Sequence, residues 1–493
     1  MKYYSTRNST LKVTAAQAIA QGLASDGGLF VPESIPQVSI EEIKTLCAMD
    51  YRLRAVDIMG RYLDEFSADE LTSFVNDAYS ENYDSREIAP VRFIDDKTGF
   101  LELWHGPTCA FKDMALQMLP RLLTASLKKL GEKRRACILV ATSGDTGKAA
   151  LEGFADVEGT SIVVFYPRDG VSDVQKLQMT TQNGENVLVS AVEGNFDDAQ
   201  TGVKLIFGDK NFAEKLNENG VFLSSANSIN WGRLLPQVVY YFSAYCDYVN
   251  SGKIKLGDAL DFCVPTGNFG DILAGWYAKG MGLPVRKLIC ASNSNNVLTD
   301  FINTGIYDRN RDFFTTISPS MDILVSSNLE RLLYMLSDDG HVKTWMNELK
   351  SSGKYNVGSD VLEAIKADYG CGCCSDDEAK AEIKSVYDEC SYLMDPHTAD
   401  AYAVLKKLRK SGEDFPTVIV STASPFKFCD SVLDALGEKS DLPGDKLIGE
   451  LSRLCDIPVP KPLEGLGGRE VRFGGCTPKE NMPDVVFDYL TNM

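Results

Sequence analysis

The sequence predicts an α/β protein, with two parallel-sheet α/β domains behind a mainly helical N-terminal segment. Short β-branched runs alternate with helical stretches from about residue 91, as in RACILVAT, GKAALEGFADV, TSIVVFYP and VSDVQKLQMTTQNG. The same alternation returns at LDFCVPTG, DILAGWYAKGMG and VRKLICAS, and late in the chain at TADAYAVLKKLRKSG and TVIVSTAS. Strands that alternate with helices in this way form parallel sheets with helices on both faces.

The length of the chain predicts more than one domain. At 493 residues it exceeds the roughly 250–300 residues that a single hydrophobic core can organise. We expect a mainly helical segment over residues 1–90, where EEIKTLCAMDYRLRAVDIMGRYLDEF has apolar residues at helical spacing. A smaller α/β domain should follow over residues 91–235, and a larger one over residues 236–493.

The charge of the chain excludes some partners. Acidic residues number 69 and basic residues 50, and the net charge is −19. Such a chain repels nucleic acid and anionic membranes at long range, so we expect neither as a partner. A small anionic ligand is still compatible, provided that its site is locally positive. The opening MKYYSTRNSTLKV lacks the apolar core of a signal peptide, and no apolar run is long enough to span a membrane. We therefore expect a cytoplasmic protein that acts on a small molecule; a monomer is compatible with these features.

The 13 cysteines are scattered through the chain, which is typical of a reducing compartment. Cys371, Cys373 and Cys374 cluster in DYGCGCCSDDE, but they contain only one C-x-x-C spacing. A structural zinc site usually takes two paired units. We expect a flexible loop with an acidic rim and no metal; metal binding by these thiols is the alternative.

A turn after an apolar strand is the first candidate for ligand binding. The strand Phe262–Val264 leads into Gly267-Asn268-Phe269-Gly270-Asp271, and a helix follows. Glycines allow the backbone N–H groups to converge on one point, and the helix adds the partial positive charge of its N-terminus. This pattern suits a phosphate, although its spacing fits neither the dinucleotide fingerprint nor the P-loop. An ordinary strand–turn–helix corner is the alternative.

A second strand ends in Ser143-Gly144-Asp145-Thr146-Gly147 and opens another helix. Gly147-Lys148 suggests a P-loop, but Thr142 stands at the upstream glycine position and Ala149 follows Lys148. The remaining amides and hydroxyls suit a carboxylate or a phosphate. A helix start capped by Ser or Asp explains the same residues equally well.

Lys112 lies in an apolar stretch, beside Ala110, Phe111 and Met114. Burial in such surroundings would lower the pKa of the lysine and leave an amine able to act as a nucleophile. The alternative is a lysine on the wet face of an amphipathic helix.

Two further residues follow strands or polar turns. Thr422 lies where the run TVIVS ends, and small hydroxyl residues at the carboxyl end of a parallel strand face the usual ligand crevice. Arg233 follows SSANSIN, and its guanidinium could bind phosphate oxygens in a bidentate manner. A plain turn at Thr422 and a surface ion pair at Arg233 are the alternatives.

Taken in order, these segments resemble the threonine synthases, within the tryptophan-synthase-β-like, fold type II group of pyridoxal-phosphate enzymes. The resemblance covers nearly the whole chain, and HGPTCAFKD and GLASDGGLFVPE are its most specific parts. The others are YYSTRN, ATSGDTG, FYPRDGVSDVQKLQM, VEGNFDDAQ, NSINWGR, PTGNFGD and MDPHTADAY. Relatives often have a histidine after the Thr-Ala of the last strand motif, where this chain has Ser424, so no role of a histidine is carried over there.

The resemblance implies roles for the candidate residues. Lys112 would bind pyridoxal 5'-phosphate as the Schiff-base lysine. Thr422 would face the pyridine nitrogen of the cofactor. The cofactor phosphate would be lined by Gly267, Asn268, Phe269 and Asp271.

For the substrate, the resemblance points to two other places. The substrate carboxylate would be received by Ser143, Gly144, Asp145 and Thr146. Arg233, together with Asn227, would bind the substrate phosphate. The implied activity is that of a lyase, which converts O-phospho-L-homoserine and water into L-threonine and phosphate.

Other functions are compatible with the same motifs. A threonine or serine dehydratase, or a threonine-synthase-like phospho-lyase, would use the same cofactor site and differ in its products. A pseudoenzyme that binds an amino acid or phosphate as a regulatory module is a rival of another class, and the presence of Lys112 argues against it.

Overall fold

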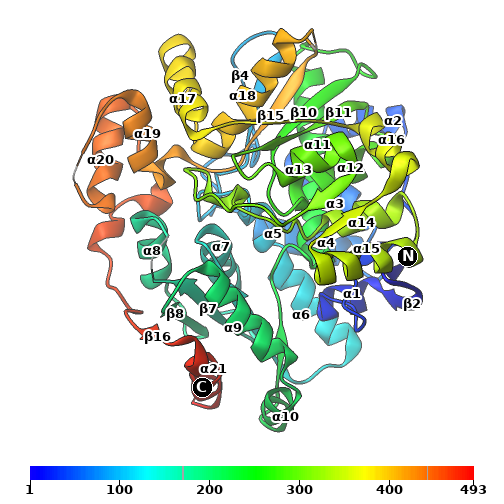
Figure 1. Cartoon of the computed structure of the whole chain (residues 1–493), viewed down its shortest axis with the longest axis vertical. Helices are drawn as coiled ribbons and strands as arrows, with labels where there is room; N and C mark the ends of the chain where they lie inside the picture. Colours follow the sequence, from blue (N-terminus) through cyan, green and yellow to red (C-terminus); the bar gives the residue numbers. More distant parts are fainter. Residues whose placement is uncertain (169–170, 413, 441, 493) are drawn as a thin grey trace.

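The fold contains two large sheets in which most strands are parallel (Figure 1). The computed structural model describes residues 1–168, 171–412, 414–440 and 442–492. The smaller sheet has five strands, all paired in parallel. The larger sheet has six strands, of which only the β4–β5 pair is antiparallel. The predicted α/β class with parallel sheets is therefore confirmed. Of the motif FYPRDGVSDVQKLQM, Asp169 and Gly170 lie outside the described residues.

The order of the strands differs from their order in the sequence. In the five-stranded sheet it is β16 (Cys476–Thr477), β8 (Val187–Val192), β7 (Thr160–Pro167), β6 (Arg135–Ala141) and β9 (Val221–Ser224). In the six-stranded sheet it is β14 (Tyr369–Cys373), β11 (Val285–Ser292), β10 (Leu260–Pro265), β15 (Thr417–Ser421), β5 (Thr98–Glu102) and β4 (Val91–Phe93). A small antiparallel pair joins β12 (Ile306–Asp308) and β13 (Lys354–Asn356).

Helices cover the sheets and link their strands. The helices between β5 and β10 in the chain are α5 (Asp113–Leu116), α6 (Leu119–Leu130), α7 (Asp145–Phe154), α8 (Asp173–Thr180), α9 (Phe196–Gly208), α10 (Lys210–Glu218) and α11 (Trp231–Asn250). The later ones are α12 (Gly270–Gly280), α13 (Val297–Thr304), α14 (Leu329–Met335), α15 (Asp339–Ser352), α16 (Gly358–Asp368), α17 (Asp376–Cys390), α18 (Pro396–Lys410), α19 (Cys429–Leu436), α20 (Gly444–Cys455) and α21 (Met482–Thr491). Among the described residues, none of these helices is both long and apolar enough to cross a bilayer.

The central strands of both sheets, such as β6, β7 and β10, are buried on both faces, as their continuous apolar runs predict. In β6, Ile138 and Val140 face the main core, while Cys137 and Leu139 face a smaller core with α9 and α21. Alternate residues of a strand point to opposite faces, so a run without polar positions needs a cover on each side. Figure 1 shows α21, at the C-terminal end of the chain, beside α9 on this outer face.

The N-terminal segment contains helices, but also a small sheet. Its helices are α1 (Ala15–Gln21), α2 (Ile40–Cys47), α3 (Tyr51–Gly60) and α4 (Ala68–Ala78). Before and between them, β1 (Lys2–Ser5) pairs in antiparallel fashion with β2 (Asn8–Thr14) and β3 (Phe30–Pro32). Strands β1 and β3 have only four and three residues, too few to show a clear period of two in the sequence, and their pairing is what stabilises them.

The two sheets draw strands from across the expected domain limits. Strands β4 and β5, within residues 91–235, lie in the six-stranded sheet. Strand β16, within residues 236–493, lies in the five-stranded sheet. The predicted domain boundaries at residues 90 and 235 therefore remain a proposal.

The cysteine cluster forms the edge of the larger sheet and not the expected loop. Cys371 and Cys373 lie in β14, which pairs in parallel with β11, and Ser375 then caps α17. Glycine and cysteine give a weak local signal for a strand, so pairing with β11 decides this conformation. Within the described residues, no cluster of His, Cys, Asp or Glu is arranged to hold a metal ion.

Candidate active site

All the predicted site motifs follow the carboxyl ends of parallel strands. The turns after β10 and β15 and the segment after β5 belong to the larger sheet, and the turns after β6 and β9 belong to the smaller one. Ligands of open parallel sheets bind at such ends. The contacts described below show that these five segments meet at one place between the two sheets.

Lys112 is buried at the centre of this region. It directly precedes α5 and is 8% exposed, so it does not lie on a wet helix face. Its Nζ lies 3.3 Å from Oδ2 of Asp145 and 3.2 Å from Oγ of Ser320. The Phe111 ring lies under the amine, with 4.8 Å between Nζ and the ring centroid.

The surroundings of Lys112 favour its neutral form. Burial is the main cause that lowers the pKa of its amine, because an ammonium loses its hydration there. Asp145 opposes this effect, while the positive charges of Arg233 and Lys427 add to it. An amine whose pKa is lowered in this way is available as a nucleophile and as a base.

Asp145 connects groups from three parts of the chain. Its Oδ2 accepts from Lys112, and its Oδ1 accepts from Nε2 of Gln175 at 2.8 Å. Nζ of Lys427 lies 2.8 Å from the same Oδ1. Burial would raise the pKa of this carboxyl, but the ammonium group of Lys427, the strongest opposing influence, helps to lower it well below its usual range. Asp145 is therefore a fixed anion inside the site.

The Gly267 turn lies next to Lys112, with Ser320 between them. A Cβ on Gly267 would lie 2.5 Å from the Ser320 carbonyl oxygen, so only glycine allows this approach. Among the described residues, none accepts a hydrogen bond from the backbone N–H groups of residues 267–272. These amides and the N-terminus of α12 form a cradle that suits a phosphate.

The backbone of this turn, more than its side chains, can face a ligand. Phe269 has a φ of 64°, and its buried ring packs 5.6 Å from that of Tyr369. The carboxylate of Asp271 accepts hydrogen bonds from the hydroxyls of Tyr240 and Tyr241 in α11. Asn268 is exposed, and its carbonyl accepts from Nδ2 of Asn328 at 3.1 Å.

Thr422 is held beside Lys112 through the backbone. Its carbonyl accepts the N–H of Phe111 at 2.8 Å, and Ala423 forms a bridge with Ala110. Thr422 is buried, and its hydroxyl has no hydrogen-bond partner within the described part of the chain. Ser424, at the position where relatives have histidine, accepts from the N–H of Phe426 and caps a short 3₁₀ turn.

The loop after β6 presents free hydroxyls. Ser143 and Thr146 are half-buried, and neither hydroxyl bonds to another described residue. Gly144 has a φ of 135°, and a Cβ there would lie 2.5 Å from the Gln175 side chain. Lys148 points away, since its ammonium pairs with Glu152 at 2.7 Å. The loop is thus arranged to bind a ligand through Ser143 and Thr146, and Lys148 does not take part.

Arg233 is a buried cation, so the surface ion pair does not form. It is 5% exposed, and its Nη1 donates to the Ala226 carbonyl at 2.8 Å. Within the described residues no carboxylate forms an ion pair with it, and burial lowers its pKa to about 10. Asn227 lies in the same turn. This turn is next to the cradle, since a Cβ added at Gly270 would lie 3.7 Å from the Cβ of Ser228. A buried, unpaired guanidinium is favourable only beside an anion.

The structure adds four residues to the predicted site. Ser320 touches Lys112, and Lys427 touches Asp145. Nε2 of His397 accepts the N–H of Ser320 at 3.2 Å, while Nδ1 of His397 bonds to Asp395. Arg331 is fully buried and donates to Asn328 and to the carbonyl of Ile229, which connects the cradle to the Arg233 turn. His397 lies in the MDPHTADAY motif, and Lys427 follows the TVIVSTAS run by three positions, but nothing local shows where their side chains point.

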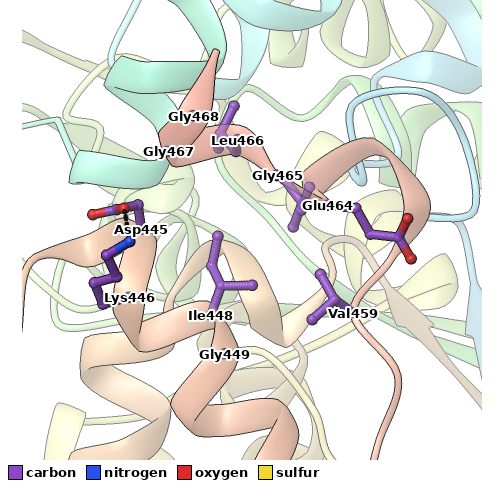
Figure 2. Close-up of a pocket in the computed structure, with 11 residues that line it drawn as sticks. Asp445, Lys446, Ile448, Gly449, Val459, Glu464, Gly465, Leu466, Gly467 and Gly468 are labelled. Atoms are coloured by element: carbon purple, nitrogen blue, oxygen red, sulfur yellow. Dashed lines mark ion pairs between the residues drawn. The ribbon is translucent and has the colours of Figure 1, made fainter.

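A pocket of about 490 Å³ lies apart from these residues, between α20 and the turn at Gly465–Gly468 (Figure 2). Its described lining contains Ile448, Val459 and Leu463, with the Asp445–Lys446 ion pair at the rim. None of the predicted site residues lines it. The contacts of Lys112, and not this pocket, therefore define the candidate active site.

Three family models match the chain. Residues 2–79 match the threonine synthase N terminus, residues 100–423 the pyridoxal-phosphate dependent enzymes, and residues 398–479 the C-terminal part of threonine synthase. Together they account for most of the chain, from the first strand to β16.

Relatives and solved structures agree with these models. The chain is 45% identical over 433 residues to human threonine synthase-like 1, of whose length it spans 58%. It is 39% identical over 490 residues to threonine synthase of Saccharomyces cerevisiae, with 92% of this chain and 93% of that protein covered. The crystal structure of the yeast threonine synthase matches with a TM-score of 0.89, and a pyridoxal-phosphate-bound threonine synthase from Brucella melitensis with 0.87. Sequence identity is 36% and 38% over 100% of this chain and 99% of each of those chains. The chain therefore belongs to the threonine synthase family of pyridoxal-phosphate-dependent enzymes.

Proposed function

We propose that the chain is a pyridoxal-phosphate-dependent lyase that converts O-phospho-L-homoserine and water into L-threonine and inorganic phosphate. The observation that carries this proposal is the position of the Lys112 amine. It is buried beside the amide cradle at residues 267–272, and it is close enough to Arg233 for that guanidinium to lower its pKa. An amine-reactive cofactor with a phosphate, and a substrate with a second phosphate, would satisfy both anion sites.

The residues present fit pyridoxal phosphate. Lys112 would bind the cofactor through its aldehyde, and the free amides of residues 267–272 would hold the cofactor phosphate. Thr422, whose hydroxyl is unpaired among the described residues, would face the ring nitrogen. When bound, the cofactor supplies an electron sink for the substrate α-carbon. A hydroxyl in place of a carboxylate at the ring nitrogen would keep that nitrogen unprotonated, which weakens the sink and restricts side reactions.

The charges of the site fit a phosphate ester. Within the described residues, the two cations Lys427 and Arg233 face one fixed anion, Asp145, so this place is locally positive although the chain carries a net charge of −19. Arg233 would bind the substrate phosphate, with Asn227 beside it. Ser143, Gly144 and Thr146 would receive the substrate carboxylate through hydroxyls and amides. Asp145 itself is an anion, so it would position these cations and not bind the carboxylate directly.

Lys112 would then move the protons of the reaction. Its neutral amine would take the proton from the substrate α-carbon, and it would transfer protons at the neighbouring carbon while the phosphate leaves toward Arg233. Ser320, 3.2 Å from Nζ, would keep the amine oriented between these steps. Water would finally add to the β-carbon.

Product analysis tests this function. Purified protein loaded with pyridoxal phosphate should release threonine and phosphate from O-phospho-L-homoserine in equal amounts. The second candidate is a phospho-lyase, favoured by the higher identity to threonine synthase-like 1 than to yeast threonine synthase. That enzyme would release 2-oxobutanoate, ammonia and phosphate without threonine. A chain that takes up the cofactor but releases no phosphate would contradict both functions.

A further inference from the structure

Lys427 is a second buried lysine at the reacting amine, and the proposed chemistry does not use it. It is 0% exposed, and its Nζ lies 2.8 Å from Oδ1 of Asp145 and 2.8 Å from the Thr108 carbonyl. Asp145 thus lies between two lysine side chains, with Lys427 on one oxygen and Lys112 on the other at 3.3 Å.

The position of Lys427 is fixed independently of Lys112. The 3₁₀ turn Pro425–Lys427 begins at Ser424, whose carbonyl accepts the N–H of Lys427 at 3.1 Å. The carbonyl of Thr108 then holds the ammonium. Lys427 is therefore built into the fold and does not depend on a ligand.

This arrangement decides which lysine Asp145 neutralises. A buried carboxylate with Lys112 as its single partner would stabilise the ammonium form of Lys112 and make the amine unreactive. Lys427 occupies the nearer contact and supplies the compensating charge. We propose that Lys427 is a positioning residue, the counter-ion of Asp145, and that it thereby keeps Lys112 neutral enough to react with a carbonyl group.

The inference rests on the cofactor that the proposed function requires at Lys112, but not on the identity of the substrate. Other ionisable groups that act on these two lysines are Arg233, Asp113, Asp271 and Cys109. Of these, only Arg233 is a further cation. Its effect on Lys112 has the same direction as that of Lys427, so Arg233 is left unchanged in the test below.

The test measures how fast the Lys112 amine of apoprotein condenses with pyridoxal phosphate, as a function of pH. One C=N bond forms and one water is released, and the visible absorbance of the product reports the reaction. The pH at which this rate is half-maximal, the midpoint, follows the titration of the Lys112 amine. Lys427→Gln keeps an N–H for Thr108 but removes the charge, so the midpoint should rise by about one pH unit. Lys427→Arg keeps the charge and should keep the wild-type midpoint.

Asp145→Asn provides the matched test, since it removes the carboxylate and leaves Lys427 charged. The midpoint should then fall below that of the wild type. This test does not depend on whether the Lys427 variants fold. In Lys427→Gln/Asp145→Asn the midpoint should return toward the wild-type value, because neither partner remains. A Lys427→Gln protein that loses thermal stability but keeps the wild-type midpoint would overturn the inference, as would a rise with Asp145→Asn. Absence of any adduct in the wild type would overturn both this inference and the proposed function, whereas an adduct without threonine formation would overturn the proposed function alone.

Discussion

The hydroxyl of Ser320 lies 3.2 Å from the amine of Lys112, although 208 positions separate them in the chain. Ser320 also brings its carbonyl oxygen against Gly267, so it is in contact with both the amine and the phosphate cradle. A segment far from either motif therefore fixes the distance between them.

Replacement of Lys112 by alanine should abolish covalent binding of the cofactor. The visible absorbance of the loaded protein should disappear, and phosphate release should fall by at least about 10³-fold, the range expected for loss of a general base. Lys148→Ala is a suitable control, because Lys148 is also buried but pairs with Glu152. Turnover that persists in Lys112→Ala would remove this lysine from the mechanism.

Arg233→Ala should weaken binding of the substrate phosphate. Loss of a charge-assisted hydrogen bond of about 1.5–3 kcal/mol corresponds to a KM about 10–150-fold higher. Inhibition by inorganic phosphate should weaken in parallel. Steady-state kinetics with both ligands measure this, and Arg233→Lys should retain part of the affinity. If KM and phosphate inhibition stay as in the wild type, Arg233 does not bind the phosphate.

Ser320→Ala should lower kcat by about 10-fold while KM changes little, because one hydrogen bond to the Lys112 amine is lost. His397→Ala should have an effect in the same direction, since His397 accepts the N–H of Ser320 and holds it in place. The double variant should be no worse than the more affected single variant, because both changes act through one contact. Fully additive losses would mean that His397 acts independently of Ser320.

Asp271 should make the stability of the apoprotein depend on pH. Burial raises the pKa of its carboxyl to about 6, while the hydroxyls of Tyr240 and Tyr241 oppose that rise. The folded state thus holds the proton more tightly than the unfolded state, whose pKa is near 3.9. Proton binding by Asp271 therefore stabilises the folded state. This contribution to the free energy of unfolding is complete below the unfolded-state pKa and is lost as the pH rises through about 6.

Asp271→Asn should remove this dependence. The difference in the free energy of unfolding between this variant and the wild type should be about 2 kcal/mol more favourable to the variant at pH 7.5 than at pH 4.5. Urea unfolding of apoprotein across that range measures the change, with the exposed Asp488→Asn as a control that leaves the slope as in the wild type. An unchanged slope in Asp271→Asn would show that this carboxyl does not titrate there.

The sequence determined the alternation of strands and helices and the places where turns follow strands. It did so because a run such as that of β6 is apolar at every position after Arg135 and must be covered on both faces. Glycine is also needed where Gly144 and Gly267 approach their neighbours. Lys112, Arg233 and Thr422 could be singled out for the same local reasons.

The tertiary structure decided what no local pattern encodes. Strands β4 and β5 join the later sheet, the cysteine segment becomes the edge strand β14, and Ser320 and Lys427 meet Lys112 and Asp145. These outcomes depend on pairing and contact between residues far apart in the chain. The free energy of such contacts depends on burial and distance, which only the folded chain defines.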